Sequence, residues 1–231
     1  MEIIARIRSP FAQKFGVPRQ SGLVETEAEI VFEPPYRTAD ALRGLEGFSH
    51  IWLLWEFHQM ADKEWTPTVR PPRLGGNARM GVFATRSPHR PNPIGLSCVR
   101  LLGIGETKDG PVLRISGADL VDGTPIYDIK PYLSYCDSHP EATGGWTDTV
   151  ESVHLSVDFP ERLLSAIPES DRPGLLGVLA QDPRPRYQDD PERVYGLTYG
   201  NVNVKFRVAE DILSVISVGE DDSVRPQRSD P

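Results

Sequence analysis

Cysteine is scarce in this sequence, and the usual signals of a membrane span or a metal site are missing. Cys98 and Cys136 are its two cysteines, and they form no C-x-x-C pair, which is typical of free thiols in a reducing compartment. None of the five histidines has another histidine four residues away, so a zinc site is not expected. No apolar run approaches the roughly 20 residues that span a bilayer, and the N-terminus lacks the pattern of a signal peptide. These absences predict a cytoplasmic protein with no membrane partner and no metal.

Common catalytic fingerprints are missing as well. The sequence contains no G-x-x-x-x-G-K-[ST] and no G-x-S-x-G, and Gly103-Ile104-Gly105 lacks the third glycine of a dinucleotide-binding loop. With 231 residues, 39% of them hydrophobic and 25% charged, the chain can form one large domain, alone or with a small appendage. A net charge of -8 argues against general coating of nucleic acid.

Acidic residues are absent from one long stretch, between Thr66 and Gly105. Six arginines fall within that stretch: Arg70, Arg73, Arg79, Arg86, Arg90 and Arg100. Such segregation predicts one positive face on an otherwise acidic protein. The alternative is that these arginines are scattered over a solvated surface and bind nothing.

The first two thirds of the sequence is typical of short β-strands. Residues 1–8 and 23–32 alternate apolar and polar side chains, and residues 50–57 are nearly continuously apolar, as in a strand buried on both faces. Residues 79–85, 96–104 and 111–120 are further strand candidates, and Asp122-Gly123 is a strong turn pair between two more. Residues 39–48 predict a short helix with Thr38 as its N-cap. Many short strands and few long helices favour a mainly β fold built on a β-barrel.

The pattern changes near residue 158. Two short helices are expected at 161–167 and 173–181, followed by strands that turn at Gly200-Asn201. We therefore expect a β-barrel domain over residues 1–157, a small α+β C-terminal domain over 158–219, and a frayed tail over 220–231.

One loop combines positive charge with stiffness. The run ATRSPHRPNPIGLS, residues 84–97, has three prolines, each of which fixes its own φ and restricts the residue before it. Stiffness lowers the entropy cost of holding Arg86, Arg90 and Asn92 in one arrangement, and an arginine fork suits a carboxylate or a phosphate. The alternative is a purely structural role, in which the prolines stiffen a connecting loop and the arginines face solvent.

These residues also carry a resemblance to a known family. The run RPPRLGGNARMGVFATRSPHRPNPIGLS resembles the hallmark of the TrmO (TsaA/YaeB-like) family, as do FGVPRQSGL, FHQ, LVDGTPIYDIKPY and LAQDPRPRY. The resemblance covers nearly the whole chain in order. It implies an S-adenosylmethionine-dependent tRNA methyltransferase that acts on N6-threonylcarbamoyladenosine beside the anticodon. It also implies a β-barrel methyltransferase domain and a homodimer.

The resemblance implies a set of site residues. The residues expected to contact the cofactor come from four motifs: Pro18, Arg19, Gln20, His58, Gln59, Arg86, Asp122, Gly123, Thr124, Pro125 and Asp128. Those expected to contact the tRNA anticodon stem-loop are Arg90, Asn92, Arg184, Arg186 and Tyr187. The catalytic candidates are Arg86, His58 and Asp128. Arg86 or Arg90 could pair with the threonyl carboxylate of the substrate.

Several of these assignments have structural alternatives. His58 could be a hydrogen-bonded core residue, Asp122 a turn cap, and Asp128 half of a strand-edge pair. The DPRPRY run could form an inter-domain or dimer contact. Methyl transfer to a ureido nitrogen is expected to need a base, which the sequence does not name. Two other functions also remain open: a non-catalytic RNA-binding barrel, and a methyltransferase for a small metabolite or a protein.

Overall fold

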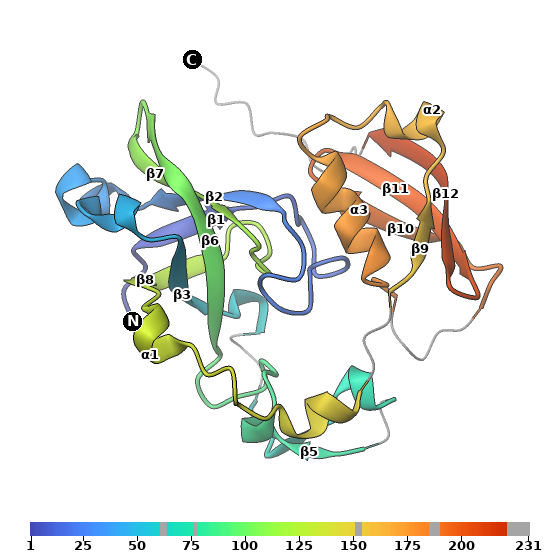
Figure 1. Ribbon diagram of the computed structural model, residues 1–231, viewed down its shortest axis with the longest axis horizontal. Coiled ribbons are helices and arrows are strands. Elements are labelled where there is room, and N and C mark those ends of the chain that lie inside the picture. The colour runs from blue at the N-terminus through green and yellow to red at the C-terminus, as the bar shows by residue number, and fades with distance from the viewer. Residues whose placement is uncertain (61–63, 76–77, 151–153, 185–189, 221–231) are drawn as a thin grey trace.

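The computed structural model describes residues 1–60, 64–75, 78–150, 154–184 and 190–220. The described chain is mainly β and forms a six-stranded sheet, a four-stranded sheet and a two-stranded hairpin (Figure 1). Its α-helices are short: α1 (Ser134–Asp137), α2 (Glu161–Leu164) and α3 (Arg172–Ala180). Single 3-10 turns lie at Pro34–Tyr36, Ala39–Leu42, Leu45–Gly47, His58–Met60, Pro72–Leu74, Val82–Ala84 and Gly145–Thr149.

The six-stranded sheet is antiparallel and closes on itself, in the order β1-β2-β7-β6-β3-β8. Its strands are β1 (Ala5–Arg8), β2 (Glu27–Phe32), β3 (His50–Glu56), β6 (Ile94–Thr107), β7 (Gly110–Ser116) and β8 (Pro125–Pro131). Closure comes from β1, which pairs with β2 on one side and, through Ala5 opposite Ile126, with β8 on the other. No strand of this sheet is left with a free edge along its whole length, which removes the hazard of edge pairing.

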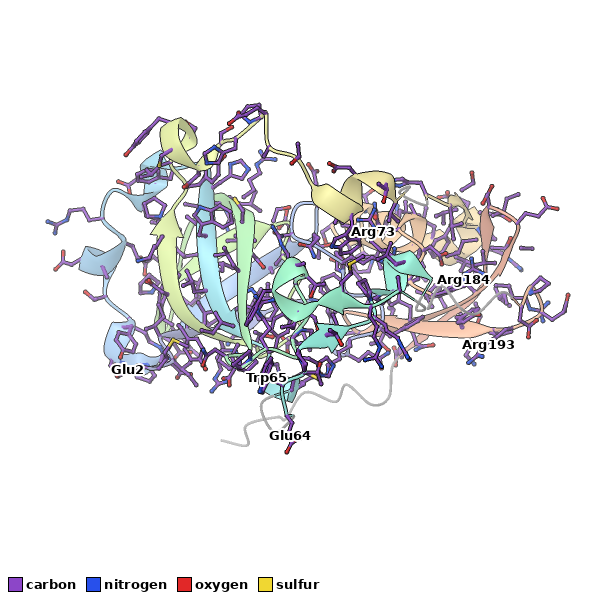
Figure 2. All side chains as sticks on the ribbon, turned by 90° about the horizontal axis from the view of Figure 1, so that it is seen from below. Glu2, Glu64, Trp65, Arg73, Arg184 and Arg193 are labelled. Carbon is purple, nitrogen blue, oxygen red and sulfur yellow. The ribbon has the colours of Figure 1, made fainter. Side chains whose placement is uncertain are left out.

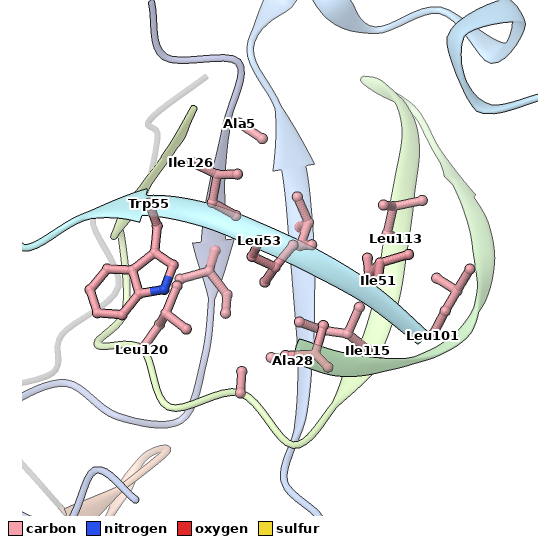
Figure 3. Close-up of a cluster of buried hydrophobic side chains, with 14 of the residues drawn as sticks. Ala5, Ala28, Ile51, Leu53, Trp55, Leu101, Leu113, Ile115, Leu120 and Ile126 are labelled. Atoms are coloured by element: carbon pink, nitrogen blue, oxygen red, sulfur yellow. The ribbon is translucent and has the colours of Figure 1, made fainter. Parts of the chain in front are cut away.

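The interior of this sheet is filled by side chains from alternate positions. In β3, Ile51, Leu53 and Trp55 are buried while their neighbours are not, as the two-residue period of a strand requires (Figure 3). They pack against Leu113 and Ile126 of the facing strands. Each fully buried side chain of this size contributes about 1.5–3 kcal/mol. In the view of Figure 3 the indole of Trp55 lies at one end of the cluster, the end that adjoins the candidate site.

The four-stranded sheet has the order β10-β11-β12-β9. Its strands are β9 (Ser156–Asp158), β10 (Tyr195–Tyr199), β11 (Val202–Ala209) and β12 (Ile212–Glu220), and β9 runs parallel to β12. The core between this sheet and α3 also takes in Phe11 and Val24 from the N-terminal segment. The amide of Gly200 donates to the carbonyl of Pro10 at 2.8 Å. The two sheets are therefore joined through residues far apart in the sequence.

Most predicted elements are present, with three exceptions. The helix predicted at 39–48 is wrong: two 3-10 turns replace it, because Gly44 between them has a φ of +88°, and Thr38 makes no side-chain cap. The strand predicted at 79–85 ends at Gly81 and gives way to a 3-10 turn, so the arginine loop leaves a turn instead of a strand. The other face of β3 is half-buried, not fully buried.

Candidate functional site

Three adjoining cavities lie beside the loop 84–97. The arginine cavity has a volume of about 990 Å³, the central cavity about 420 Å³ and the small cavity about 180 Å³. The arginine and central cavities share the lining residues Arg19, Gln20, Thr85 and Arg86. The central and small cavities share Val17, Trp55, Phe57 and Asp119. The central cavity therefore adjoins both of the others.

The loop that carries Pro18, Arg19 and Gln20 is held from two sides. Gly16 has a φ of +91° and packs so closely on Leu197 of the second sheet that a Cβ there would overlap its side chain. The Arg19 guanidinium donates from Nη2 to the carbonyl of Asp182 at 3.0 Å. The three predicted cofactor residues of this loop therefore line the central cavity on a segment held by the second sheet and by the residue Asp182 that follows α3.

Arg86 faces Gln20 across the boundary of the arginine and central cavities. Its Nη1 donates to the side-chain oxygen Oε1 of Gln20. Arg86 is exposed, so its guanidinium is accessible to a ligand in either cavity. The two motifs that the resemblance linked to the cofactor, 66 residues apart, meet here.

Arg90 is held by nearby backbone carbonyls, and its contact with the substrate stays a prediction. Its Nη1 donates to the carbonyls of Val82 and Thr85, at 3.0 and 2.8 Å, and its guanidinium lies 5.5 Å from the ring centre of Phe83. These contacts brace the proline-rich loop from inside, although Arg90 also lines the central cavity. Asn92 is exposed and lines none of the three cavities.

Asp119 is a site residue that the sequence reasoning missed. It lines both the central and the small cavity, and among the described lining residues of the central cavity it is the one acid. Ser97 donates from Oγ to Asp119 Oδ1 at 2.6 Å and accepts from Trp55 Nε1 at 2.9 Å. Burial raises the pKa of Asp119, while the hydrogen bond from Ser97 and the charge of Arg86 act in the opposite direction. Its signal in the sequence was an acid three residues after the end of β7, in SGADL.

Close packing fixes the series of hydrogen bonds from Trp55 through Ser97 to Asp119. Gly95 of β6 lies opposite Trp55, and a Cβ on it would overlap the indole ring. Because Gly95 has no side chain, the Trp55 ring can lie over it and reach Ser97, which is also on β6. Phe57 packs on Trp55 with ring centres 4.3 Å apart. The aromatic wall of the central cavity and the Asp119 carboxyl are thus set by one local arrangement.

The turn of residues 122–125 reaches the site only in part. Thr124 lines the small cavity, together with His58 and Gln59. Asp122 Oδ1 accepts the amide of Ser9 at 2.9 Å, so the Asp122 side chain ties this turn to the segment that follows β1. The carbonyl of Gly123 accepts from Arg6 of β1, and Pro125 of β8 lies opposite the same arginine. Asp122, Gly123 and Pro125 line none of the three cavities.

The structure does not bring Asp128 to the site. Its Oδ2 forms an ion pair with Lys130 at 2.8 Å, and its Oδ1 accepts the amide of Ile129 at 2.9 Å. Asp128 lines a separate cavity, beside Tyr36. The strand-edge alternative describes it, and the catalytic role predicted for it finds no geometric support because its carboxylate is absent from all three cavities.

The small cavity holds His58 and Gln59 next to a fixed acid. Tyr127 donates from its hydroxyl to Glu56 Oε2 at 2.6 Å, and burial together with Glu56 raises the pKa of Tyr127 to about 12. His58 begins the 3-10 turn that follows β3 and lines this cavity.

Arg184 is engaged within the protein. Its guanidinium binds both carboxylate oxygens of Asp182, with Nε to Oδ1 at 2.9 Å and Nη2 to Oδ2 at 3.1 Å. The two side chains are only 11% and 10% exposed. This arrangement fits the inter-domain alternative, because the carbonyl of Asp182 also accepts from Arg19, and the RNA contact of Arg184 stays a prediction. Arg186 and Tyr187 lie outside the described residues.

No group of three or more His, Cys, Asp or Glu side chains in the described chain is arranged to hold a metal ion. Within the same residues, no helix is long and apolar enough to cross a membrane.

Comparison with known proteins gives consistent matches over most of the chain. The family model for the tRNA-methyltransferase O N-terminal domain matches residues 6–138, and that for the TrmO C-terminal domain matches residues 153–221. A tRNA (adenine(37)-N6)-methyltransferase of Escherichia coli K12 is 48% identical over 219 residues, which cover 90% of this chain and 93% of that protein. A putative S-adenosylmethionine-dependent methyltransferase, RcsF, of Pseudomonas aeruginosa is 41% identical, over 95% of this chain and 97% of that protein.

A solved structure agrees with these matches. The crystal structure of TrmO from Pseudomonas aeruginosa superposes with a TM-score of 0.74 at 36% identity, and the match covers 94% of this chain and 97% of that one. Two family models and a full-length structural match point the same way, and the chain belongs to the TrmO family.

Proposed function

We propose that this protein is an S-adenosylmethionine-dependent methyltransferase that methylates N6 of adenine 37, next to the anticodon of tRNA. The observation that carries the proposal is the meeting of Arg19, Gln20 and Arg86 at one cavity in a chain of the TrmO family. The printed name of the E. coli relative, at 48% identity, supports the reaction, and that of the P. aeruginosa relative supports the cofactor. We further propose that the preferred acceptor is N6-threonylcarbamoyladenosine.

The residues of the central cavity fit the proposed cofactor. A volume of about 420 Å³ lies within the usual range for small-molecule sites, roughly 300–1,000 Å³. The guanidinium groups of Arg19 and Arg86 suit the carboxylate of the methionine part. Trp55 and Phe57 offer aromatic surface for the adenine, and Gln20 offers an amide for the ribose. If one end of the cofactor extends into the adjoining small cavity, it would contact His58, Gln59 and Thr124 there.

The chemistry divides between the bound group and the protein. When bound, S-adenosylmethionine supplies an activated methyl group. The residues that line the central cavity would hold the cofactor beside the acceptor nitrogen, and such positioning would provide much of the rate. Asp119 presents a carboxyl with a raised pKa to the central cavity, and its second oxygen can accept the proton that N6 loses. Arg86 can pair with the carboxylate of the threonyl group on the substrate.

The division of labour along the chain is also a proposal. We propose that residues 1–157 form the β-barrel methyltransferase domain, that 158–219 form a small α+β domain near the tRNA, and that the enzyme is a cytoplasmic homodimer. Ile94 and Leu96 support the dimer, because they lie on the exposed outer face of β6 and are 36% and 54% exposed. Both also line the central cavity, so a second copy on this face would help to close it. Leu96→Glu should give monomers in light scattering if the proposal holds.

Methylation of two tRNA preparations tests the proposed reaction. One is taken from cells that make the threonylcarbamoyl modification and the other from cells that lack it. The proposal expects methyl transfer to position 37 of the first only, because a cavity lined by several arginines suits an anionic acceptor. Equal methylation of both would reject the threonylcarbamoyl preference, and methylation of neither would reject the function. Calorimetry with S-adenosylmethionine then separates an RNA-binding protein, which would show no heat, from an enzyme for another substrate.

A further inference from the structure

The arginine cavity is the largest hollow among those beside the loop 84–97, and its lining has one sign of charge. Five arginines line it: Arg19, Arg70, Arg73, Arg79 and Arg86. None of the described lining residues is an Asp or a Glu. At about 990 Å³ it has more than twice the volume of the central cavity. A chain with a net charge of -8 therefore keeps one anion-attracting hollow directly beside the proposed reaction site.

The hairpin of β4 (Thr68–Val69) and β5 (Met80–Gly81) holds three of these arginines. Arg70 directly follows β4 and Arg79 directly precedes β5, and both are exposed. Arg79 contacts Thr68 of the opposite strand, with Nη1 to Oγ1 at 3.4 Å. Arg73 donates from Nη2 to the carbonyl of Val150 at 3.0 Å and lies close to the turn Gly145–Thr149 in Figure 2. These three arginines therefore lie on a hairpin that is held by strand pairing and by the hydrogen bonds of Arg73 and Arg79.

Trp146 adds a flat aromatic wall to the same cavity. Its Nε1 donates to the carbonyl of Ala84 at 2.8 Å, which ties the ring to the root of the proline-rich loop. Four prolines on the opposite walls, Pro67, Pro71, Pro72 and Pro88, restrict the backbone. Arginines beside a fixed aromatic ring are the arrangement with which proteins bind unpaired RNA, since phosphates pair with the guanidinium groups and bases stack on the ring.

We propose that the arginine cavity binds the RNA backbone of the anticodon loop next to the target adenine, with Arg70 and Arg79 on phosphates and Trp146 stacked on an unpaired base. This inference rests on the proposed function, since it assumes that tRNA is the substrate. The shared lining of Arg19, Gln20, Thr85 and Arg86 places a nucleotide held here directly beside the central cavity. The RNA contact predicted for Arg184 thereby moves to exposed arginines of the acid-free stretch.

The double variant Arg70→Ala, Arg79→Ala tests the phosphate contacts. Its matched control is Arg100→Ala, Arg114→Ala, which removes the same charge from two exposed arginines that line none of the three cavities. Binding of an anticodon stem-loop RNA to the full chain is measured at several salt concentrations. We expect the cavity variant to bind about tenfold more weakly or worse, and its plot of log K against log salt to lose about 0.7 unit of slope per phosphate contact. S-adenosylmethionine affinity should stay unchanged in both variants.

Trp146→Phe and Trp146→Leu separate stacking from the loop contact. Both variants lose the hydrogen bond to Ala84, but only phenylalanine keeps a ring. The proposal expects the phenylalanine variant to bind RNA several-fold more tightly than the leucine variant. Equal RNA affinity of these two variants would reject the stacking role.

The outcomes separate this proposal from the proposed function. RNA affinity and salt slope of the cavity variant equal to those of its control would overturn the docking site, even if the wild type methylates tRNA. Loss of cofactor binding in the cavity variant would also overturn it, because the cavity would then belong to the cofactor. If the wild type methylates no tRNA but the cavity variant still loses RNA affinity and slope, the docking site stands and the function fails.

Discussion

Asp119→Asn removes the acid of the central cavity with little change of shape. An asparagine has nearly the same volume, and its side-chain oxygen can still accept the hydrogen bond of 2.6 Å from Ser97. The bond from Trp55 Nε1 to Ser97 at 2.9 Å is also preserved, so the fold around the cavity should persist. What the variant loses is a group that can take a proton from the acceptor nitrogen. We therefore expect folding and cofactor affinity close to those of the wild type.

The fall in rate of Asp119→Asn, and its dependence on pH, follow from the proposed role of Asp119 as a general base. A positioned general base contributes about 10²–10⁴-fold to a rate, so kcat should fall by that factor, equivalent to about 3–5 kcal/mol. The base must be ionised, so wild-type activity is lost as the pH falls through the pKa of Asp119. Burial raises this pKa, which places the loss above the ordinary aspartate value of about 4. The variant should lack this acidic limb.

The assay is the single-turnover methylation rate of modified tRNA from pH 5 to pH 9, with cofactor binding measured by calorimetry. Asp128→Asn is the comparison, because Asp128 is paired with Lys130 away from the three cavities. We expect its rate to stay within about threefold of the wild type, as for a surface substitution. The reasoning is refuted if Asp119→Asn keeps the wild-type rate and acidic limb, or if Asp128→Asn shows the large loss instead.

Three further predictions concern the loops and the cofactor. Arg184→Ala should lower the free energy of unfolding by about 3–5 kcal/mol, because it leaves Asp182 nearly buried without its ion-pair partner; an unchanged urea midpoint would contradict this. Gly95→Ala should lower it by about 1–3 kcal/mol, because the added methyl group overlaps the Trp55 ring, and the change should appear in both the melting temperature and the tryptophan fluorescence. Addition of a chelator should leave S-adenosylmethionine affinity unchanged, as calorimetry with and without it would report, and a large loss would reveal a metal requirement.

Local pattern was sufficient for much of the fold. The alternation of apolar and polar residues identified the faces of β1 and β2, because successive side chains in a strand point to opposite sides. The turn at Gly200-Asn201 and helices α2 and α3 also lie where the sequence predicts them. Periodicity alone predicted one helix over residues 39–48, but Gly44 in the middle of this range has a left-handed φ that ends helical structure there. The hydrophobic pattern contains no information about that backbone angle.

For the site, the sequence by itself determined which motifs matter, and the tertiary structure decided which of their side chains meet. The acid-free stretch and the proline-rich loop identified the arginines, since charge and stiffness are properties of the residues themselves. Burial and contacts with distant segments cannot be seen in a motif: the Arg184–Asp182 pair is only 11% and 10% exposed, and the carbonyl of Asp182 accepts a hydrogen bond from Arg19, 163 residues earlier. Asp128 lines a cavity other than the three of the site. Ser97 and Asp119 are 22 residues apart in the sequence, and the antiparallel pairing of β6 with β7, with Arg100 opposite Ser116, brings their segments together.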